Sequence, residues 1–217
     1  MRISILCSDS QHPITASLDD WMARHQLEHQ IELSRAKAQL SGGDILFLIS
    51  CHELIQSDVR GLYGATLVIH ASDLPLGRGW SPHIWQVLEK KSTIKVTLLE
   101  AADAVDSGDI WSQADFELEG HETFDEINSK LFAAEIRLMD FAVENFGKVS
   151  PRRQDGRSPT MYRKRTPMDS RIDPTLSLAD QFDLLRVADP SRFPAFFDLR
   201  GHRYFIQITK DKPNAKK

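Results

Sequence analysis

Residues Val68–Trp85 read VIHASDLPLGRGWSPHIW, and residues Val96–Trp111 read VTLLEAADAVDSGDIW. The first stretch continues an apolar run that stops at His70, which is typical of a buried strand. The second starts inside another apolar run and passes into a loop that carries Asp106. Ligands of open α/β sheets bind outside the carboxyl ends of the strands. We therefore expect two strands of one sheet to bring this imidazole and this carboxylate to the same edge.

The rest of the first 150 residues alternates between apolar runs and amphipathic stretches. The unbroken apolar run at 44–50 is typical of a parallel strand covered on both faces. Thr123-x-x-Glu126 is a capping box, which marks the start of a long helix. This rhythm predicts an α/β fold with a doubly wound, mostly parallel sheet. The expected strands cover 2–7, 29–33, 44–50, 65–70 and 94–99, and the expected helices cover 14–26, 81–90 and 123–147.

The character of the sequence changes after residue 150. Four prolines between 151 and 174 exclude a long helix there, and the segment is basic, with Arg152, Arg153, Arg157, Arg163, Lys164 and Arg165. A short helix over 178–187 and a β-hairpin that turns at Arg200–Gly201 are expected to follow. We therefore predict a core, 1–150, and a C-terminal extension, 151–217, made of a basic loop, a short helix and a hairpin.

Composition narrows the class of protein. A length of 217 residues and a hydrophobic share of 41% suit one soluble domain with a small appendage. The net charge of -4 argues against nucleic acid as the main partner. The first residues predict a strand instead of a signal peptide, and no apolar run approaches the roughly 18 residues of a membrane helix. The two cysteines, Cys7 and Cys51, are expected to be reduced thiols in the core, and their spacing is not that of a metal site. We therefore predict a cytoplasmic protein with no metal and no membrane partner.

Two readings of the His70 and Asp106 pair follow from its chemistry. A histidine that faces a carboxylate can act as a general acid–base group, or as a cation that stabilises a developing oxyanion. It can equally be a structural histidine whose hydrogen bonds are satisfied. Gly42-Gly43 precedes a strand instead of opening a helix, so it is not a dinucleotide fingerprint, and no serine nucleophile elbow is present.

The motifs around this pair occur in the order His70-Ala-Ser-Asp-Leu-Pro75, Gly77-Arg-Gly-Trp-Ser-Pro82 and Val105-Asp-Ser-Gly-Asp-Ile110. This order resembles the formyltransferases that use 10-formyltetrahydrofolate, whose pattern is Asn-x-His-x-Ser-x-Leu-Pro and a later Asp-x-Gly. The resemblance covers roughly residues 40 to 150. It implies a Rossmann-like formyltransferase core in which His70 and Asp106 are catalytic.

One position departs from that pattern. Val68 stands where the family has an asparagine, and valine has no hydrogen-bond donor. Another group could polarise the formyl oxygen, and the candidates are Ser50, His52, Ser72 and His83. The departure also leaves open a non-catalytic homologue that binds folate or a nucleotide.

The resemblance further implies that 10-formyltetrahydrofolate is the co-substrate, with no metal. Its pterin is expected against backbone groups of two loops. The positions that match those loops are Cys51, Glu53, Leu54, Ala102, Ala104 and Asp106.

The sequence of the C-terminal extension bears on the acceptor. Tyr162-Arg-Lys-Arg-Thr-Pro, Phe193-Pro-Ala-Phe-Phe and Gly201-His-Arg-Tyr204 are similar to tails of short sugar-nucleotide N-formyltransferases of bacterial pseudaminic-acid-type pathways. This implies a UDP-linked 4-amino-4,6-dideoxy sugar as acceptor, with cations for its diphosphate and an aromatic ring for its base. A different small amine, or hydrolysis of formyltetrahydrofolate, stays open, as do a homodimer and a purely solvated arginine loop. The residues expected to contact the acceptor are Ser72, Arg78, Gly79, Trp80, Tyr162 and Arg163.

Overall fold

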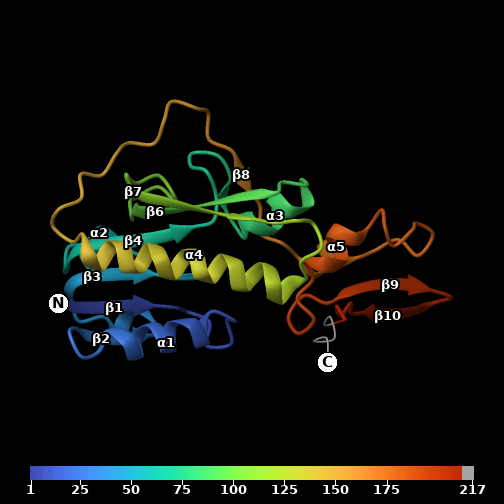
Figure 1. Ribbon diagram of the computed structural model, residues 1–217, viewed down its shortest axis with the longest axis horizontal. Coiled ribbons are helices and arrows are strands. Elements are labelled where there is room, and N and C mark those ends of the chain that lie inside the picture. The colour runs from blue at the N-terminus through green and yellow to red at the C-terminus, as the bar shows by residue number, and fades with distance from the viewer. Residues whose placement is uncertain (212–217) are drawn as a thin grey trace, which may run out of the picture.

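A six-stranded sheet lies at the centre of the computed structural model, which describes residues 1–211 (Figure 1). Its strand order is β2-β1-β3-β4-β6-β7, and the pairings among the first four are parallel. The predicted α/β class with a mostly parallel sheet is confirmed. The strands are β1 (Arg2–Leu6), β2 (Gln30–Ser34), β3 (Gly43–Leu48), β4 (Tyr63–His70), β6 (Thr93–Glu100) and β7 (Ile110–Glu117).

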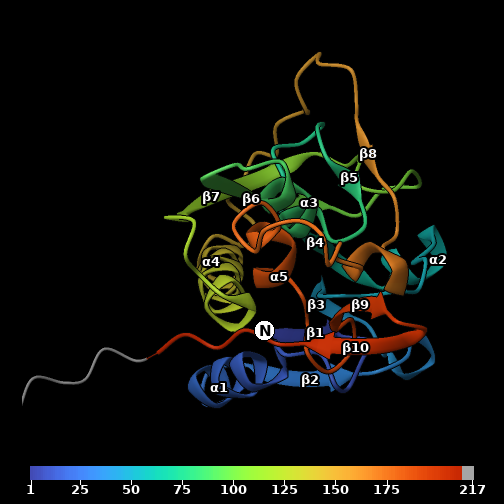
Figure 2. The same cartoon turned by 90° about the vertical axis from the view of Figure 1, so that its right-hand side faces the viewer.

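The main core lies between one face of the sheet and two helices, α1 (Thr15–His25) and α4 (Phe124–Glu144). Figure 2 shows α1 and α4 on the same side of the sheet, with α2 (Ser57–Arg60) on the other side. The predicted capping box opens α4, because the Thr123 N–H donates to Glu126 Oε2 at 2.9 Å. The buried stripe of α4 recurs at helical spacing, as predicted for an amphipathic helix.

The opposite face of the sheet is covered more thinly. A smaller apolar cluster lies there, and its buried members are Leu6, Leu46, Leu48, Ile55 and Tyr63. Because side chains alternate along a strand, Thr66, Val68 and His70 of β4 share one face while Leu67 and Ile69 share the other. Leu67 belongs to the main core and Val68 packs against the smaller cluster. His70 therefore lies on the face away from α1 and α4.

The last two strands of the sheet differ from the prediction. Strand β6 is antiparallel to β4, and the unpredicted strand β7 is antiparallel to β6. Helix α3 (Pro82–Leu88), between β4 and β6, has seven residues and so spans about 10 Å. The eight residues of β4 span about 26 Å. This helix is too short to carry the chain back to the start of β4, so the chain returns directly as an antiparallel strand.

The segment after α4 returns across the core (Figure 1). Strand β8 (Met161–Tyr162) pairs with β5 (Arg78–Gly79), and the predicted hairpin is present as β9 (Ala195–Leu199) and β10 (His202–Ile206). The 3-10 helices are η1 (Lys37–Gln39) and η2 (Pro167–Ser170). No helix within residues 1–211 has the apolar length needed to cross a bilayer.

The predicted helix over 178–187 is shorter than expected. Helix α5 covers only Phe182–Arg186. The Gln181 carboxamide is tied to the backbone of Asp173 through hydrogen bonds of 2.6 and 2.9 Å, and the Asp180 N–H donates to Ser177 Oγ at 3.1 Å. These bonds hold residues 177–181 in a turn, so the helix begins after Gln181 and Ser177 is not the helix cap that its position before 178–187 predicts.

Candidate active site

The two residues singled out from the sequence lie next to each other. His70 is the last residue of β4, and its Nδ1 lies 3.6 Å from Oδ2 of Asp106. Both side chains are only 8% exposed. Asp106 comes from the loop between β6 and β7, where its backbone has a left-handed φ of 53°. The fold thus brings together an imidazole and a carboxylate that are 36 residues apart in the sequence.

The route by which Asp106 reaches His70 differs from the prediction. Because β6 runs antiparallel to β4, its last residue, Glu100, lies beside Leu67 and not beside His70. The loop after Glu100 therefore folds back over the sheet. Gly108 makes this fold possible, since a Cβ atom there would lie 1.9 Å from the Glu100 carbonyl oxygen. The expectation that two carboxyl ends of strands meet at this site is wrong, although the two side chains do meet.

The hydrogen bonds of the pair define what it can do. His70 Nε2 lies 2.8 Å from the Gly77 carbonyl oxygen, which only accepts, so Nε2 carries a hydrogen. Nδ1 then faces Asp106, whose Oδ2 also accepts the Gly79 N–H at 2.9 Å. A proton on Nδ1 would make His70 an imidazolium paired with the carboxylate. Such a pair can stabilise an oxyanion or exchange a proton with a substrate.

Val68 lies on the same face of β4 as His70, and its side chain makes apolar contacts there. It packs against a small buried cluster made of Leu74, Leu99 and Ile110. Its side chain offers no donor to a substrate oxygen. Two hydroxyls that flank it in the sequence, Thr66 Oγ1 and Ser72 Oγ, are buried without a hydrogen-bond partner in the described residues.

Three other side chains were candidates to replace the missing asparagine as the group that polarises the formyl oxygen. Ser50 Oγ bonds to His12 Nε2 at 3.0 Å, and the His52 ring lies 5.6 Å from the Trp80 ring. Burial lowers the pKa of His83 to about 3, so this imidazole is neutral at pH 7. Ser72 is therefore the candidate with a free hydroxyl in the chain segment that follows His70.

The loops expected to hold the pterin border a cavity of about 410 Å³. Leu54 lines this cavity, whereas the side chains of Cys51 and Glu53 bond to other parts of the protein. Cys51 Sγ lies 3.4 Å from the Glu53 carbonyl oxygen, and Glu53 Oε1 accepts the Lys37 N–H at 2.9 Å. Ala102 and Ala104 flank Asp103, which reaches the cavity from the other loop and pairs with Arg60. The full lining is Leu54, Ile55, Gln56, Ser57, Asp58, Arg60 and Asp103.

The residues expected to contact the acceptor fall into two groups. Arg78 and Gly79 form β5, and Trp80 follows with 40% of its surface exposed, its ring 4.6 Å below Lys164 Nζ. Tyr162 and Arg163 instead pack on α3: the Tyr162 hydroxyl donates to Glu89 at 2.7 Å, and both residues contact the Trp85 ring. Tyr162 also borders the histidine–aspartate pair, because it pairs with Gly79, whose N–H donates to Asp106.

Two arginines of the basic segment form ion pairs within the protein. Arg157 Nη1 donates to Asp73 Oδ2 at 2.9 Å, and Arg163 pairs with Asp169. Within residues 1–211, no carboxylate lies within 4.0 Å of the side-chain nitrogens of Arg78, Arg152, Arg153, Lys164 or Arg165. Two of the six cations of the basic segment therefore form ion pairs, while its other four and Arg78 have no carboxylate partner in the described residues.

Two polar residues that sequence reasoning missed contact the site from this segment. Thr160 Oγ1 accepts the Gly77 N–H at 2.7 Å. Gln154 Nε2 donates to the Asp106 carbonyl at 2.8 Å. No motif marks either residue, because each contact joins positions at least 48 residues apart.

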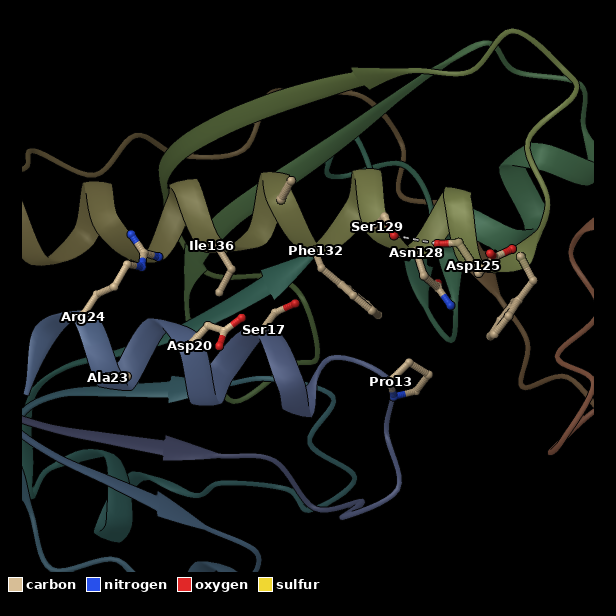
Figure 3. Close-up of a pocket in the computed structure, with 12 residues that line it drawn as sticks. Pro13, Ser17, Asp20, Ala23, Arg24, Asp125, Asn128, Ser129, Phe132 and Ile136 are labelled. Atoms are coloured by element: carbon tan, nitrogen blue, oxygen red, sulfur yellow. Dashed lines mark hydrogen bonds between the residues drawn. The ribbon is translucent and has the colours of Figure 1, made fainter. Parts of the chain in front are cut away.

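A larger cavity, about 900 Å³, lies between α1 and α4 (Figure 3). Its lining includes the apolar side chains of Phe124, Phe132 and Ile136 and the carboxylates of Asp20 and Asp125. None of the predicted site residues lines it. Size alone therefore does not identify the candidate site.

No protein-family model matches the chain. The chain is 29% identical over 132 residues to the methionyl-tRNA formyltransferase of Rickettsia bellii, a match that covers 60% of this chain and 43% of the relative. It is 24% identical over 177 residues to the methionyl-tRNA formyltransferase of Fusobacterium nucleatum, covering 80% of this chain and 56% of the relative. The chain thus spans about half the length of these curated relatives.

Solved structures share the whole fold. A methionyl-tRNA formyltransferase from Clostridium thermocellum has a TM-score of 0.82 and 20% identity, covering 100% of this chain and 95% of that one. A sugar N-formyltransferase from a Shewanella species has a TM-score of 0.73 and 14% identity, covering 99% of both chains. HypX from Aquifex aeolicus, in complex with tetrahydrofolic acid, has a TM-score of 0.78 and 21% identity, covering 96% of this chain and 37% of that one. The chain therefore has the formyltransferase fold, with a sequence similar to that of the methionyl-tRNA formyltransferases.

Proposed function

We propose that this protein is an N-formyltransferase that moves a formyl group from 10-formyltetrahydrofolate to a primary amine. The observation that carries the proposal is the His70–Asp106 pair, 3.6 Å apart on the thinly covered face of a formyltransferase fold. The similarity to methionyl-tRNA formyltransferases supports the same reaction type.

In the proposed reaction, a neutral amine attacks the formyl carbon and a new C–N bond forms. The carbonyl oxygen becomes an oxyanion, and protonated His70, held by Asp106, stabilises it through Nε2–H. The bond to N10 of the folate then breaks. Asp106 or an ordered water accepts the proton lost by the amine, and this proton returns to the leaving tetrahydrofolate. Because Nε2–H donates to the Gly77 carbonyl in the structure, the formyl oxygen must take the place of that carbonyl.

The cavity beside Leu54 and Asp103 suits the folate substrate. It is about 410 Å³, within the usual range for small-molecule sites, and it lies between the two loops expected to hold the pterin. Its lining offers backbone and polar groups from both loops. The complex of HypX with tetrahydrofolic acid supports folate as the co-substrate.

For the acceptor, we favour a nucleotide-linked amino sugar, in particular a UDP-linked 4-amino-4,6-dideoxy sugar of a bacterial pseudaminic-acid-type pathway. Arg78 and Lys164 are cations without a carboxylate partner within residues 1–211, and they suit a diphosphate. Trp80, 40% exposed, presents a ring near both. The similarity to a sugar N-formyltransferase along both full chains is consistent with this acceptor.

A second candidate acceptor is methionyl-tRNA, favoured by the sequence similarity to enzymes of that name. The net charge of -4 disfavours it, because binding to a polyanion relies on many positive charges. Hydrolysis of formyltetrahydrofolate, another small amine as acceptor, and a non-catalytic role motivated by Val68 are further alternatives.

One assay separates these possibilities. The protein is mixed with 10-formyltetrahydrofolate and, in parallel, with the UDP-amino sugar, simple primary amines, methionyl-tRNA or no amine. Tetrahydrofolate release and the mass of the formylated product are followed. We expect fast release only with the nucleotide sugar. Release of tetrahydrofolate without an amine would indicate a hydrolase. Faster release with methionyl-tRNA would identify the tRNA, and not the nucleotide sugar, as the acceptor. No release under any condition would overturn the enzymatic proposal.

The roles of the pair are tested by His70→Ala and Asp106→Asn. Each variant is expected to lose about a hundredfold or more in kcat, the scale of a lost oxyanion donor or acid–base group. His202→Ala, an exposed histidine on the distant hairpin, and Asp19→Asn, exposed on α1, serve as matched controls and should keep wild-type rates. Wild-type turnover in either site variant would contradict the assignment.

A further inference from the structure

We infer that Gln154 is a positioning residue that holds Asp106 beside His70, and its effect on catalysis rests on the proposed function. Gln154 lies half-buried in the segment between α4 and β8. Its Nε2 donates to the carbonyls of Asp106, at 2.8 Å, and Gly108, at 3.0 Å. Its Oε1 accepts from Arg78 Nη2 at 2.6 Å.

These three partners fix the orientation of the carboxamide. A guanidinium only donates and a backbone carbonyl only accepts, so the Gln154 oxygen must face Arg78 and its nitrogen must face the loop. A reversed amide would lose all three hydrogen bonds. The Gln154 side chain therefore forms a bracket between two loops: in one fixed orientation, its hydrogen bonds join the Asp106 loop to Arg78.

The loop that Gln154 holds needs such a bracket. Asp106 has a φ of 53°, a left-handed backbone conformation that non-glycine residues rarely adopt. The residues just before it, 103–105, are exposed and belong to no helix or strand. A backbone in this conformation persists only where its surroundings hold it. The two carbonyls bonded by Gln154 lie at this residue and two residues after it.

The second loop carries the hydrogen-bond partners of the catalytic pair. Arg78, bonded to Gln154, stands between Gly77, whose carbonyl accepts from His70, and Gly79, whose N–H donates to Asp106. Gln154 thus ties together the backbone of Asp106 and the strand that holds its carboxylate. It contacts neither the imidazole nor the carboxylate, so it acts through their position.

The segment around Gln154 is itself anchored on both sides. Arg152 forms a two-bond bridge with Ile110, of 2.7 and 2.9 Å. On the other side, the Arg78 N–H donates to the Thr160 carbonyl at 3.0 Å, and Arg157 pairs with Asp73. These contacts on both sides of Gln154 fix the position of its backbone relative to the Asp106 loop.

The test uses Gln154→Glu and Gln154→Ala in the full chain. Glutamate keeps the shape and the acceptor for Arg78 but sets a carboxylate oxygen against two carbonyls, and alanine removes all three bonds. We expect kcat for formyl transfer to fall about tenfold to a hundredfold in both variants, because small misplacements of a catalytic group cost that much. The KM for 10-formyltetrahydrofolate should change less than about threefold, since Gln154 does not line the cavity proposed for the folate. Gln207→Ala, at an exposed glutamine just after β10, is the matched control.

A second readout does not depend on activity. The Gly79 N–H donates to Asp106 Oδ2, so its hydrogen exchange, followed by NMR, reports on the position of that carboxylate. We expect exchange at Gly79 to accelerate about tenfold or more in both Gln154 variants, while exchange at Ile5 in the core stays unchanged.

The outcomes are distinguishable. If the wild-type protein transfers no formyl group to any acceptor, the proposed function fails and the exchange at Gly79 still tests the bracket. Unchanged exchange at Gly79 in both variants would overturn the inference. So would faster exchange at Ile5 together with Gly79, because that pattern indicates a general loss of stability instead of a local role.

Discussion

His12 is a neutral histidine held at the edge of the candidate site. Its Nδ1 accepts the Ile14 N–H at 3.3 Å, so Nε2 carries the hydrogen that faces Ser50 Oγ at 3.0 Å. Burial, with a further contribution from the positive charge of Arg192, lowers the pKa of His12 to about 4. In the unfolded chain the same group titrates near 6.5.

This difference in pKa predicts how stability depends on pH. Between pH 6.5 and about 4 the unfolded chain binds a proton at His12 that the folded protein does not. Lowering the pH through this window therefore lowers the free energy of unfolding, by up to about 1.4 kcal/mol per pH unit from this residue. Urea unfolding at pH 7, 6 and 5 is expected to show a flatter dependence for His12→Gln than for the wild type. Exposed His202→Gln is the control, and equal slopes for His12→Gln and wild type would refute the assignment.

Single residues were predictable from the sequence where a motif marks them. His70 and Asp106 stand in two motifs in a recognisable order, and the fold brings them together. Gln154 contacts the Asp106 loop from 48 residues later, and no local pattern records a contact of that kind. Tyr162 and Arg163 stay predicted acceptor contacts, and their packing on Trp85 is set by tertiary contacts that no local pattern records.

At the scale of elements, the loop between β6 and β7 decides where Asp106 lies. Gly108 is in contact with the backbone of Glu100, so an added Cβ atom would lie 1.9 Å from that carbonyl oxygen. Gly108→Ala must move the backbone of one of the two segments. We expect a loss of about 2 kcal/mol or more in the free energy of unfolding, measured in urea, because overpacked sites cost that much.

The same substitution should reduce formyl transfer, since it displaces the loop that carries Asp106. Gly156→Ala is the matched control: Gly156 lies in the segment that covers the site, and a Cβ atom there meets nothing within 4 Å. That variant should match the wild type in stability and rate. A Gly108→Ala protein as stable as the wild type would mean that the loop has room that the structure does not show.

Helices and strands were predictable from the sequence where a local pattern of residues determines them. The capping box at Thr123 and the apolar stripe of α4 gave the start and the buried face of that helix. The direction of β6 was not predictable in this way, because it depends on the length of α3 relative to β4. Strand β7, at the edge of the sheet, has mostly half-exposed residues and lacks the apolar run that marks central strands.

At the scale of the whole molecule, the predicted division into a core and a C-terminal extension hides how closely the two parts pack. Val187 belongs to the main core, and Arg186, only 3% exposed, donates to the Glu122 carbonyl at 3.3 Å. Arg192 pairs with Asp9 at 3.1 Å, and Lys210 pairs with Glu126 at 2.8 Å. The extension is therefore part of the same folded body.

This packing predicts one cooperative unfolding transition for the full chain. Native apolar contacts shared between two segments make them unfold together, as small single domains usually do. NMR signals of Ile5 in β1 and of Ala195 in β9, followed through a urea titration, are expected to vanish at the same concentration. Arg186→Ala should lower that common midpoint, because it removes a buried side chain that joins α5 to the turn before α4. Separate midpoints for Ile5 and Ala195, or a shift of the Ala195 midpoint alone in Arg186→Ala, would show instead that residues 151–211 fold as an independent unit on the core.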